Sequence, residues 1–376
     1  MGLFASVSMF NPGINMGNTV LLGHSRRGME TVMEKCVADA IGKGYAVLVF
    51  RNMSGAYSAA SSAFGGRRIF SLNSNCYVHS DKLDIYAGLN ENDYARRMLE
   101  SFDRYRPIEN SMRMLFEDYI ALIVKLCRLK MLRVKMNEFD RYDILVVDNM
   151  NKTLVTNPAE KYNNDLLIKS VQVHAASFQA YFRRFANNRV GEVLSGTESL
   201  ETVLDKNDVV EISLDFANNE LESVILMDAI IDRVCDLRYS SMRKKQLCVI
   251  TDMVSNKHMQ ESGLNRVLNL YPQCLMVYSV MDVHNLVQNG TDWVDLCDTK
   301  LCFRQNDAQN MTYCSNLFGM TYRMKLGLNL YGGKLGFGMN PMQEPKYRPE
   351  VFSGLPDNIA IYSSKHTNKD GRVQIF

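Results

Sequence analysis

Short apolar runs alternate with amphipathic stretches at the start of the chain. The run Asn18–Gly23 is apolar and ends in glycine, which predicts a buried strand. Arg26–Ile41 repeats apolar residues at helical spacing, and the apolar run Tyr45–Phe50 follows after two glycines. Strand, helix and strand in this order predict a βαβ unit and a parallel sheet, in which ligands usually bind at the carboxyl ends of the strands. A short helix is predicted over Ser58–Phe64 and a strand over Arg68–Leu72.

The pattern becomes helical between about Asn90 and Leu200. Helical spacing of apolar residues predicts helices over Glu91–Phe102, Ile108–Met136 and Leu166–Phe185. The run Asp143–Asp148, with the sequence DILVVD, predicts a strand-like interruption, with Asp148 as a turn residue. We therefore expect a mostly α-helical insertion domain over residues 91–200.

Strands and helices alternate again after this segment. Together with residues 1–90, residues 201–376 are expected to form one discontinuous α/β core with a mostly parallel sheet. No element is predicted after Phe318, where glycine, tyrosine and methionine are frequent and periodicity is weak. The predicted strands are Val209–Phe216, Gln246–Thr251, Leu275–Ser279 and Thr299–Phe303, and the predicted helices are Glu220–Leu237, Gly263–Leu270 and Val283–Gln288.

Composition narrows the class of protein. The 376 residues suffice for two domains, and 43 Lys and Arg against 41 Asp and Glu give a formal net charge of +2. A strongly basic nucleic-acid binder is thereby disfavoured. No apolar run is long enough to span a membrane, and no secretion signal is present, so we expect a soluble protein. The nine cysteines form no CxxC pair, and the six histidines show no metal-ligand spacing, which predicts reduced cysteines, a cytoplasmic location and no metal site.

The turn after the first predicted strand has the position of a phosphate-binding loop. Gly23 and Gly28 have the spacing of a P-loop, in which backbone N–H groups at a helix N-terminus bind phosphate. However, Met29 stands where the loop lysine should be, and Glu30 stands where a hydroxyl should hold Mg²⁺. A turn that binds no ligand is the alternative interpretation.

A second motif lies at the end of an apolar strand. Leu247–Asp252 ends in an acid, the form of the magnesium-binding strand end of P-loop NTPases. Met253 follows at the place of the glutamate that activates water. Alternatively, Asp252 only caps the following turn.

With both motifs in this order, the chain resembles the FtsK/HerA-like translocases. It is most similar to the TraG/TraD-like conjugative coupling proteins of type IV secretion systems, which are hexameric DNA-pumping ATPases. Asn18–Gly28 resembles their first strand and P-loop, Leu247–Met253 their second acidic motif, and Cys274–Asn289 their sensor strand and following helix. Arg348-Pro349-Glu350 and Leu355–Asn358 resemble their C-terminal signature. The resemblance implies a RecA-like P-loop NTPase core with an inserted all-α domain.

The departures from this family predict a catalytically degenerate form. Besides Met29 and Met253, Met281 stands where the sensor glutamine is expected, and Arg51 replaces the acid after the second strand. Loss of one stabilising group commonly lowers a rate ~10²-fold or more. With the phosphate cation, the hydroxyl and the base all missing, we expect no catalytic residues, negligible hydrolysis and no required cofactor.

Two alternatives remain open from the sequence. In the first, the chain is an active translocase in which Arg26 or Arg27 holds the phosphates, Thr31 supplies the hydroxyl and Asp252 the magnesium, so that ATP and Mg²⁺ are cofactors. In the second, the chain is an unrelated α/β binding protein. His24, Arg26 and Arg27 would then simply form a solvated turn.

A degenerate coupling protein is predicted to act through protein partners. We expect a structural or regulatory docking subunit of a secretion or conjugation complex, as a hexamer or hetero-oligomer. Family members usually carry a membrane span before the core; none is found in this chain, so membrane association would need a partner. DNA contact is a further possibility, since two groups of basic residues form potential patches: Lys125, Arg128, Lys130, Arg133 and Lys135, and Arg183 with Arg184 between aromatics.

Overall fold

The computed structural model describes residues 8–52, 68–73, 80–103, 108–186, 189–237, 245–252, 263–270, 274–281, 287–288, 291–331 and 334–375. The chain divides into two compact units. The first consists of residues 1–40, 251–256 and 275–376, and the second of residues 41–250 and 257–274.

The first unit contains six strands of the main sheet, in the order β1-β14-β13-β10-β2-β7. β2 is parallel to both of its neighbours and is fully buried, as its unbroken apolar sequence predicts. β13 is antiparallel to both of its neighbours. The strands are β1 (Ser8–Phe10), β2 (Thr19–Leu22), β7 (Cys274–Val280), β10 (Thr299–Cys302), β13 (Ile359–Ser364) and β14 (Lys369–Ile375).

Helices and short elements complete this unit. α1 (Arg26–Gly42) directly follows β2 and buries Met29, Val32, Met33 and Cys36 on one side. Two further helices, α12 (Ala308–Leu317) and α13 (Pro349–Ser353), lie later in the chain, with Asp307 as the N-cap of α12. The remaining short elements are η1 (Ile14–Met16), β8 (Val287–Gln288), β9 (Thr291–Asp292) and η4 (Trp293–Leu296).

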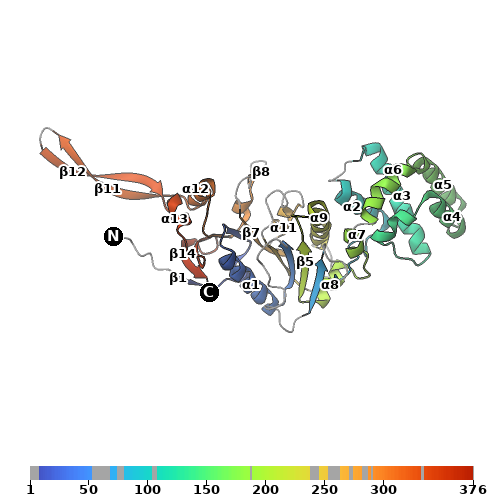
Figure 1. The fold of residues 1–376 in the computed structure, drawn as a ribbon, viewed down its shortest axis with the longest axis horizontal. Helices are drawn as coiled ribbons and strands as arrows, with labels where there is room; N and C mark the ends of the chain where they lie inside the picture. The colour runs from blue at the N-terminus through green and yellow to red at the C-terminus, as the bar shows by residue number, and fades with distance from the viewer. Residues whose placement is uncertain are drawn as a thin grey trace. The chain divides into compact units, whose positions relative to one another are not determined.

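A long two-stranded antiparallel ribbon also belongs to the first unit. β11 (Met320–Tyr331) and β12 (Lys334–Pro345) pair in continuous register from Met320 opposite Pro345 to Tyr331 opposite Lys334. Figure 1 shows the ribbon extending outward from the rest of this unit. The sequence pattern was too weak for us to predict any element here.

The second unit contains the strand order β6-β3-β5-β4. β3 and β4 are each parallel to β5, and β5 and β6 are buried along their whole length. Helix α9 is buried on nearly all sides, with thirteen buried residues. The elements are β3 (Ala46–Asn52), β4 (Ile69–Asn73), α8 (Leu200–Lys206), β5 (Val209–Leu214), α9 (Glu220–Leu237), β6 (Leu247–Asp252) and α11 (Asn265–Leu268).

A group of helices lies between β4 and α8 in sequence. Its core is aromatic: the Phe178 ring centroid lies 5.1 Å from that of Phe116, 5.0 Å from that of Tyr119 and 4.6 Å from that of Phe182. The elements are α2 (Glu91–Asp103), α3 (Asn110–Leu129), η3 (Met136–Arg141), α4 (Ile144–Leu154), α5 (Pro158–Gln172), α6 (Ala175–Ala186) and α7 (Arg189–Val193).

The chain enters and leaves this helical segment at one place. Gly196 N–H donates to the Leu83 carbonyl at 3.1 Å, and Asp84 N–H donates to the Glu198 carbonyl at 2.9 Å. A Cβ added to Gly196 would lie 2.2 Å from the Lys82 carbonyl oxygen. The two crossing segments are therefore in backbone contact. The predicted division into residues 1–90 and 201–376 against 91–200 stays a prediction.

The predicted α/β class with a mostly parallel sheet is confirmed, but DILVVD is not a strand. It begins helix α4, because the Asp143 carboxylate accepts the Val146 N–H at 2.8 Å and caps the helix. Asp148 lies within that helix and pairs with Lys152 at 2.5 Å, so its assignment as a turn residue was wrong. The helix cap at Asp143 thus decides the conformation of this run, although its β-branched residues favour a strand.

Several predicted boundaries also differ from the structure. The helix predicted to reach Met136 ends at Leu129, and Met131 has a left-handed φ of 56°. The helix predicted over Leu166–Phe185 is two helices, α5 and α6. The predicted Gly263–Leu270 helix shortens to α11, and Val287 and Gln288, predicted as helical, form β8. The predicted helix over Ser58–Phe64 lies outside the described residues.

Candidate nucleotide-binding site

The predicted phosphate loop connects β2 to α1 at the carboxyl end of β2. Gly23 has a φ of +130°, a conformation that glycine adopts easily. Its N–H donates to the Val280 carbonyl at the end of β7, at 2.9 Å, and the His24 N–H donates to the Arg304 carbonyl at 2.9 Å. Both amides are therefore engaged by other parts of the first unit.

Ser25, just before the helix, organises the next amides. Its carbonyl accepts the Met29 N–H at 3.1 Å, and its hydroxyl accepts the Gly28 N–H at 3.4 Å while donating to the Asp357 carbonyl at 2.5 Å. Arg26 N–H donates to the His24 carbonyl at 3.1 Å. Phosphate loops bind anions through N–H groups that point toward the ligand. In this loop, five of these amides donate to acceptors of the chain itself.

The space above Gly28 is occupied by the C-terminal part of the first unit. A Cβ at this position would lie 2.4 Å from the Asp357 carbonyl oxygen and 2.6 Å from Cε1 of Phe303. Gln305 is also buried beside the loop and donates from Nε2 to the Leu22 carbonyl at 3.1 Å. The glycine is thus required for close packing.

The side chains at the two altered loop positions, and those beside them, have different surroundings. Met29 is fully buried, with 0% of its surface exposed. Burial raises the pKa of the Glu30 carboxyl, Glu34 raises it further, and Arg26 opposes both effects. The Thr31 hydroxyl donates to the Arg27 carbonyl at 2.9 Å, and the side chains of Arg26 and Arg27 are exposed. The two arginines are exposed, whereas Glu30 and Thr31 are half-buried.

The acidic and sensor-like residues also belong to the first unit. Asp252 ends β6 and is 1% exposed, and Met281 follows β7 and is half-buried. Met253 lies outside the described residues. Within the described parts of the chain, no group of three His, Cys, Asp or Glu residues could hold a metal ion.

The sequence analysis assigned no role to three residues of this site, namely Ser25, Phe303 and Asp357. Ser25 could have been recognised as a helix N-cap from its type and place. Phe303 and Asp357 could not, because nothing in the local sequence indicates that segments 275 residues or more away cover the loop. The Leu355–Asn358 signature marked the segment by resemblance only, without its role.

The remaining predicted positions are mostly paired. Arg51 lies on β3, and its guanidinium pairs with the Glu211 carboxylate of β5 at 3.2 Å. Lys125 and Arg128 pair with Glu160 and Glu91 at 2.7 Å each. Arg133 donates to the Thr197 carbonyl, Lys135 pairs with Glu138 at 3.7 Å, and Lys130 and Arg183 are exposed. The predicted basic patch is therefore partly neutralised by neighbouring acids.

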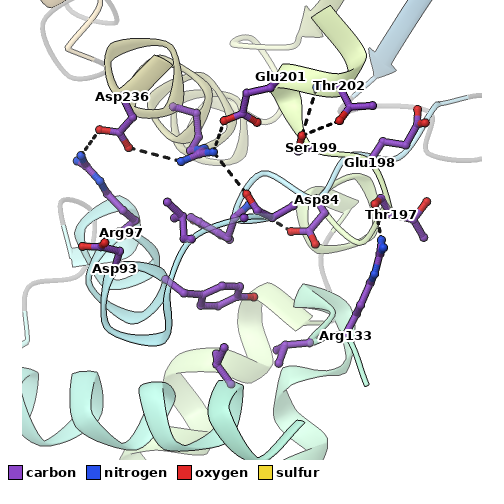
Figure 2. A pocket seen from close by; sticks show the side chains of 18 of the residues that line it. Asp84, Asp93, Arg97, Arg133, Thr197, Glu198, Ser199, Glu201, Thr202 and Asp236 are labelled. Atoms are coloured by element: carbon purple, nitrogen blue, oxygen red, sulfur yellow. Dashed lines mark hydrogen bonds and ion pairs between the residues drawn. The ribbon is translucent and has the colours of Figure 1, made fainter. Parts of the chain in front are cut away.

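A cavity of about 1190 Å³ lies in the second unit and was not predicted (Figure 2). It is lined by the segment before α2, by α2, by the end of α3, and by residues of α8 and α9. None of its lining residues belongs to the first unit, so it is separate from the predicted loop. The lining is highly charged, with five arginines and six acids: Arg96, Arg97, Arg128, Arg133, Arg233, Asp84, Asp93, Glu198, Glu201, Asp205 and Asp236.

Ion pairs connect the elements around this cavity. Arg233 of α9 is 5% exposed and pairs with Glu201 of α8 at 2.5 Å. Arg97 of α2 pairs with Asp236 of α9, and Figure 2 shows these two side chains facing each other. A buried pair is costly to break, because one charge then remains buried without its partner. The Arg97–Asp236 pair links α2 of the helical segment to α9, and the Arg233–Glu201 pair links α9 to α8.

Asp84 gives a testable pH dependence. Burial raises the pKa of its carboxyl from 3.8 to about 6, so between these pH values the folded chain binds more protons than the unfolded chain. The free energy of unfolding therefore falls as the pH rises from about 4 to about 6. Asp84→Asn keeps an acceptor for the Tyr86 N–H, and we expect it to stabilise the protein by up to about 3 kcal/mol at pH 8 and not at pH 3.5.

Urea denaturation at both pH values measures this difference. Asp205→Asn, which removes one negative charge from the same cavity, is the matched control. An equal effect of Asp84→Asn at pH 3.5 and pH 8 would contradict the assignment.

Comparisons of the sequence with known proteins find no match, whereas comparisons of the structure do. Neither a protein-family model nor a curated protein sequence matches the chain. Solved structures do match. The unbound bacterial conjugative coupling protein TrwBΔN70 has 13% identity, covers 96% of this chain and 84% of its own, and gives a TM-score of 0.63.

Two further structures match over similar lengths. TrwB in complex with a non-hydrolysable ATP analogue has 12% identity and a TM-score of 0.62, with 99% of this chain and 89% of that chain covered. VirB4 of Thermoanaerobacter pseudethanolicus has 10% identity and a TM-score of 0.58, with 96% and 89% covered. The chain has the RecA-like fold of these coupling and secretion ATPases.

The match with the unbound coupling protein covers nearly the whole of this chain, including the helical segment. A helical segment between β4 and β5 is what the alternative of an unrelated α/β protein does not predict. No described helix is both long and apolar enough to cross a membrane.

Proposed function

We propose that this chain is a non-hydrolysing relative of the P-loop ATPases of conjugation and secretion. It acts as a structural or regulatory docking subunit in a DNA-transfer or secretion complex. The observation that carries this proposal is the state of the loop, where the amides of Gly23, His24, Arg26, Gly28 and Met29 already donate to the chain's own acceptors.

The contacts above the loop support the same conclusion. A nucleotide phosphate would need the space over Gly28, where the Asp357 carbonyl and the Phe303 ring lie. TrwB, by contrast, has been solved with ADP and Mg²⁺ and with nucleotide analogues. A carbonyl oxygen beside a phosphate would also repel it. Occupation by phosphate would thus require residues 303–305 and 357 to move.

The chemistry of the altered residues points in the same direction. Met29 offers no charge to a phosphate, and its burial leaves no route for its side chain to reach one. Glu30 adds a carboxyl at the place of the magnesium-binding hydroxyl, where a negative charge is unfavourable for phosphate. Met253 and Met281 replace the water-activating and sensor groups in sequence. Positioning and electrostatic stabilisation are both reduced.

An active translocase with a non-standard loop is the second candidate. It is favoured by the exposed Arg26 and Arg27, since arginine binds phosphate in a bidentate way, and by Asp252 at the end of β6. In that case residues 303–305 and 357 open when nucleotide binds. Thr31 would then have to exchange its hydrogen bond to Arg27 for magnesium.

ATP hydrolysis and binding distinguish the two candidates. We expect no turnover above background, with or without DNA, and no Mg²⁺-dependent binding of a fluorescent ATP analogue. A known P-loop ATPase provides the positive control. DNA-stimulated turnover on the order of 1 per second would overturn the proposal. Analogue binding that is lost in Asp252→Ala would support the active translocase.

Partners and location follow from the proposal. A docking subunit without turnover would bind an active ATPase, a DNA-processing complex or a substrate adaptor, as a hexamer or a hetero-oligomer. It would act in the cytoplasm, with membrane association through a partner. DNA contact through the exposed Lys130 and Arg183 fits an active translocase better than a docking subunit.

A further inference from the structure

The β11–β12 ribbon has two chemically different faces. Residues directly opposite each other in an antiparallel pair lie on the same face, and alternate residues lie on opposite faces. One face, here called the apolar face, takes the even positions of β11 and the odd positions of β12. Eleven of its twelve residues are apolar, counting tyrosine and proline: Met320, Tyr322, Met324, Leu326, Leu328, Leu330, Leu335, Phe337, Met339, Pro341 and Pro345, with Gln343 as the exception.

The opposite face takes all the charges of the ribbon. Its twelve register positions hold Arg323, Lys325, Lys334 and Glu344, with Thr321, Asn329, Asn340, three glycines, Tyr331 and Met342. The regular alternation of β11 from Met320 to Leu330 is typical of a strand with one covered face and one solvated face. The pattern therefore implies a covering layer for the apolar face.

No described part of the chain provides that layer. β11 and β12 form a sheet of two strands, and among the described elements neither has substantial contacts except with the other. Near the base of the ribbon, Met320 is 55% and Tyr322 74% exposed. An isolated two-stranded hairpin is at best marginally stable in water. A large exposed apolar patch marks an interaction site, and the apolar face meets this description.

A lipid layer is a poor occupant. No further described strand pairs with either outer edge of the ribbon, so both edges present unpaired N–H and C=O groups. In hydrocarbon such groups would cost several kcal/mol each, whereas a protein layer over one face leaves both edges in water. Backbone hydrogen bonding thus favours protein.

We propose that the apolar face binds a second copy of this chain, with the two ribbons stacked face to face. The face carries no charge, so two identical faces approach without like-charge repulsion, and the charged residues stay on the outer sides. Stacked sheets of this kind pack about 10 Å apart.

The area is sufficient for a stable contact. Burial of one apolar side chain stabilises by about 1.5–3 kcal/mol, at about 25 cal/mol per Å² of area removed from water. Each side chain therefore removes roughly 60–120 Å² from water. Eleven such residues bury roughly 700 Å² or more on each ribbon, close to the ~800 Å² per partner of a specific interface. Symmetric pairing of one surface with itself is the commonest mode of homodimer formation.

Sedimentation velocity over a hundredfold range of protein concentration tests the stacked pair. We expect wild-type protein to dimerise with rising concentration. Leu326→Glu with Leu328→Glu, on the apolar face, should give monomers across the range. Asn329→Glu with Asn340→Glu, on the opposite face, adds the same charge and should leave the dimer intact.

A second variant guards against unfolding of the mutated ribbon. Because Met320 and Pro345 are opposed, residues 321–344 can be replaced by a short glycine turn, and this chain should melt like wild type but stay monomeric. A monomeric wild type at all concentrations would overturn the proposal, and so would a dimer that persists in the double-glutamate variant. Flotation of a monomeric wild type with phosphatidylserine vesicles would assign the face to lipid and likewise overturn it.

Discussion

Met29→Lys should lower the free energy of unfolding by about 3 kcal/mol or more, because it places an ammonium group where the native side chain is fully buried. This is the residue that a working phosphate loop would have at this position. In such a loop the lysine points toward the phosphates. Here the side chain of residue 29 is fully buried within the first unit. Chemical denaturation followed by circular dichroism measures the loss.

Met29→Leu is the control for this variant. It keeps the volume and the apolar character, and such exchanges usually cost less than 1.5 kcal/mol. A lysine variant as stable as wild type that also gains Mg²⁺-dependent nucleotide binding would show that the loop remains close to a working site. That result would remove the main support for a non-hydrolysing chain.

Gly196→Ala should destabilise the second unit by about 3 kcal/mol, near the upper end of overpacking effects. The new Cβ would lie 2.2 Å from the Lys82 carbonyl oxygen and 2.5 Å from the Leu83 nitrogen. These are backbone atoms, so no change of rotamer relieves the contact. The two crossing segments must then separate, and the hydrogen bond from Gly196 N–H to Leu83 weakens or breaks.

Gly42→Ala is the matched control, since nothing lies within 4 Å of a Cβ at that helical position. Alanine favours helix over glycine by about 1 kcal/mol, so this variant should be neutral or slightly more stable. Thermal unfolding of both variants gives the comparison. Equal melting temperatures for Gly196→Ala and wild type would show that the crossing segments are looser than the contact distances indicate.

Apolar periodicity was enough to predict most of the sheet and the largest helices. The strands β2, β3, β5, β6 and β7 are predominantly apolar, and α9 was predicted with its observed bounds. A fully buried strand leaves this signature because both faces are covered. The signal fails for DILVVD, where a helix cap at Asp143 decides the conformation of a run that β propensity alone would make a strand.

The sequence indicated where the candidate site lies, but not that its loop amides already donate hydrogen bonds within the chain. The glycine spacing and the apolar strand ending in Asp252 located the loop and its acidic neighbour. That the Gly23 and His24 amides are engaged depends on Val280 and Arg304, which are far away in sequence. Long-range backbone contacts of this kind leave no local pattern. The charged cavity escaped for the same reason, since its arginines and acids come from five separate segments.

The ribbon was missed because its strands are rich in glycine and lie outside the main sheet. Gly327 and Gly338 oppose each other in the register and weaken any local propensity for strand. The alternation of β11 is nevertheless regular from Met320 to Leu330, and counting it against a period of two would have predicted the strand.

The contact between Leu83 and Gly196 has a consequence for the history of the fold. A segment of more than one hundred residues leaves and rejoins the chain where Leu83 and Asp84 are hydrogen-bonded to Gly196 and Glu198, so its two ends are as close as the ends of a tight turn. A polypeptide joined in this way is gained or lost at one point without displacing the flanking strands β4 and β5. The helices from α2 to α7 thus have the geometry of an exchangeable cassette, which a lineage could replace to meet a new partner while the sheet stays as it is.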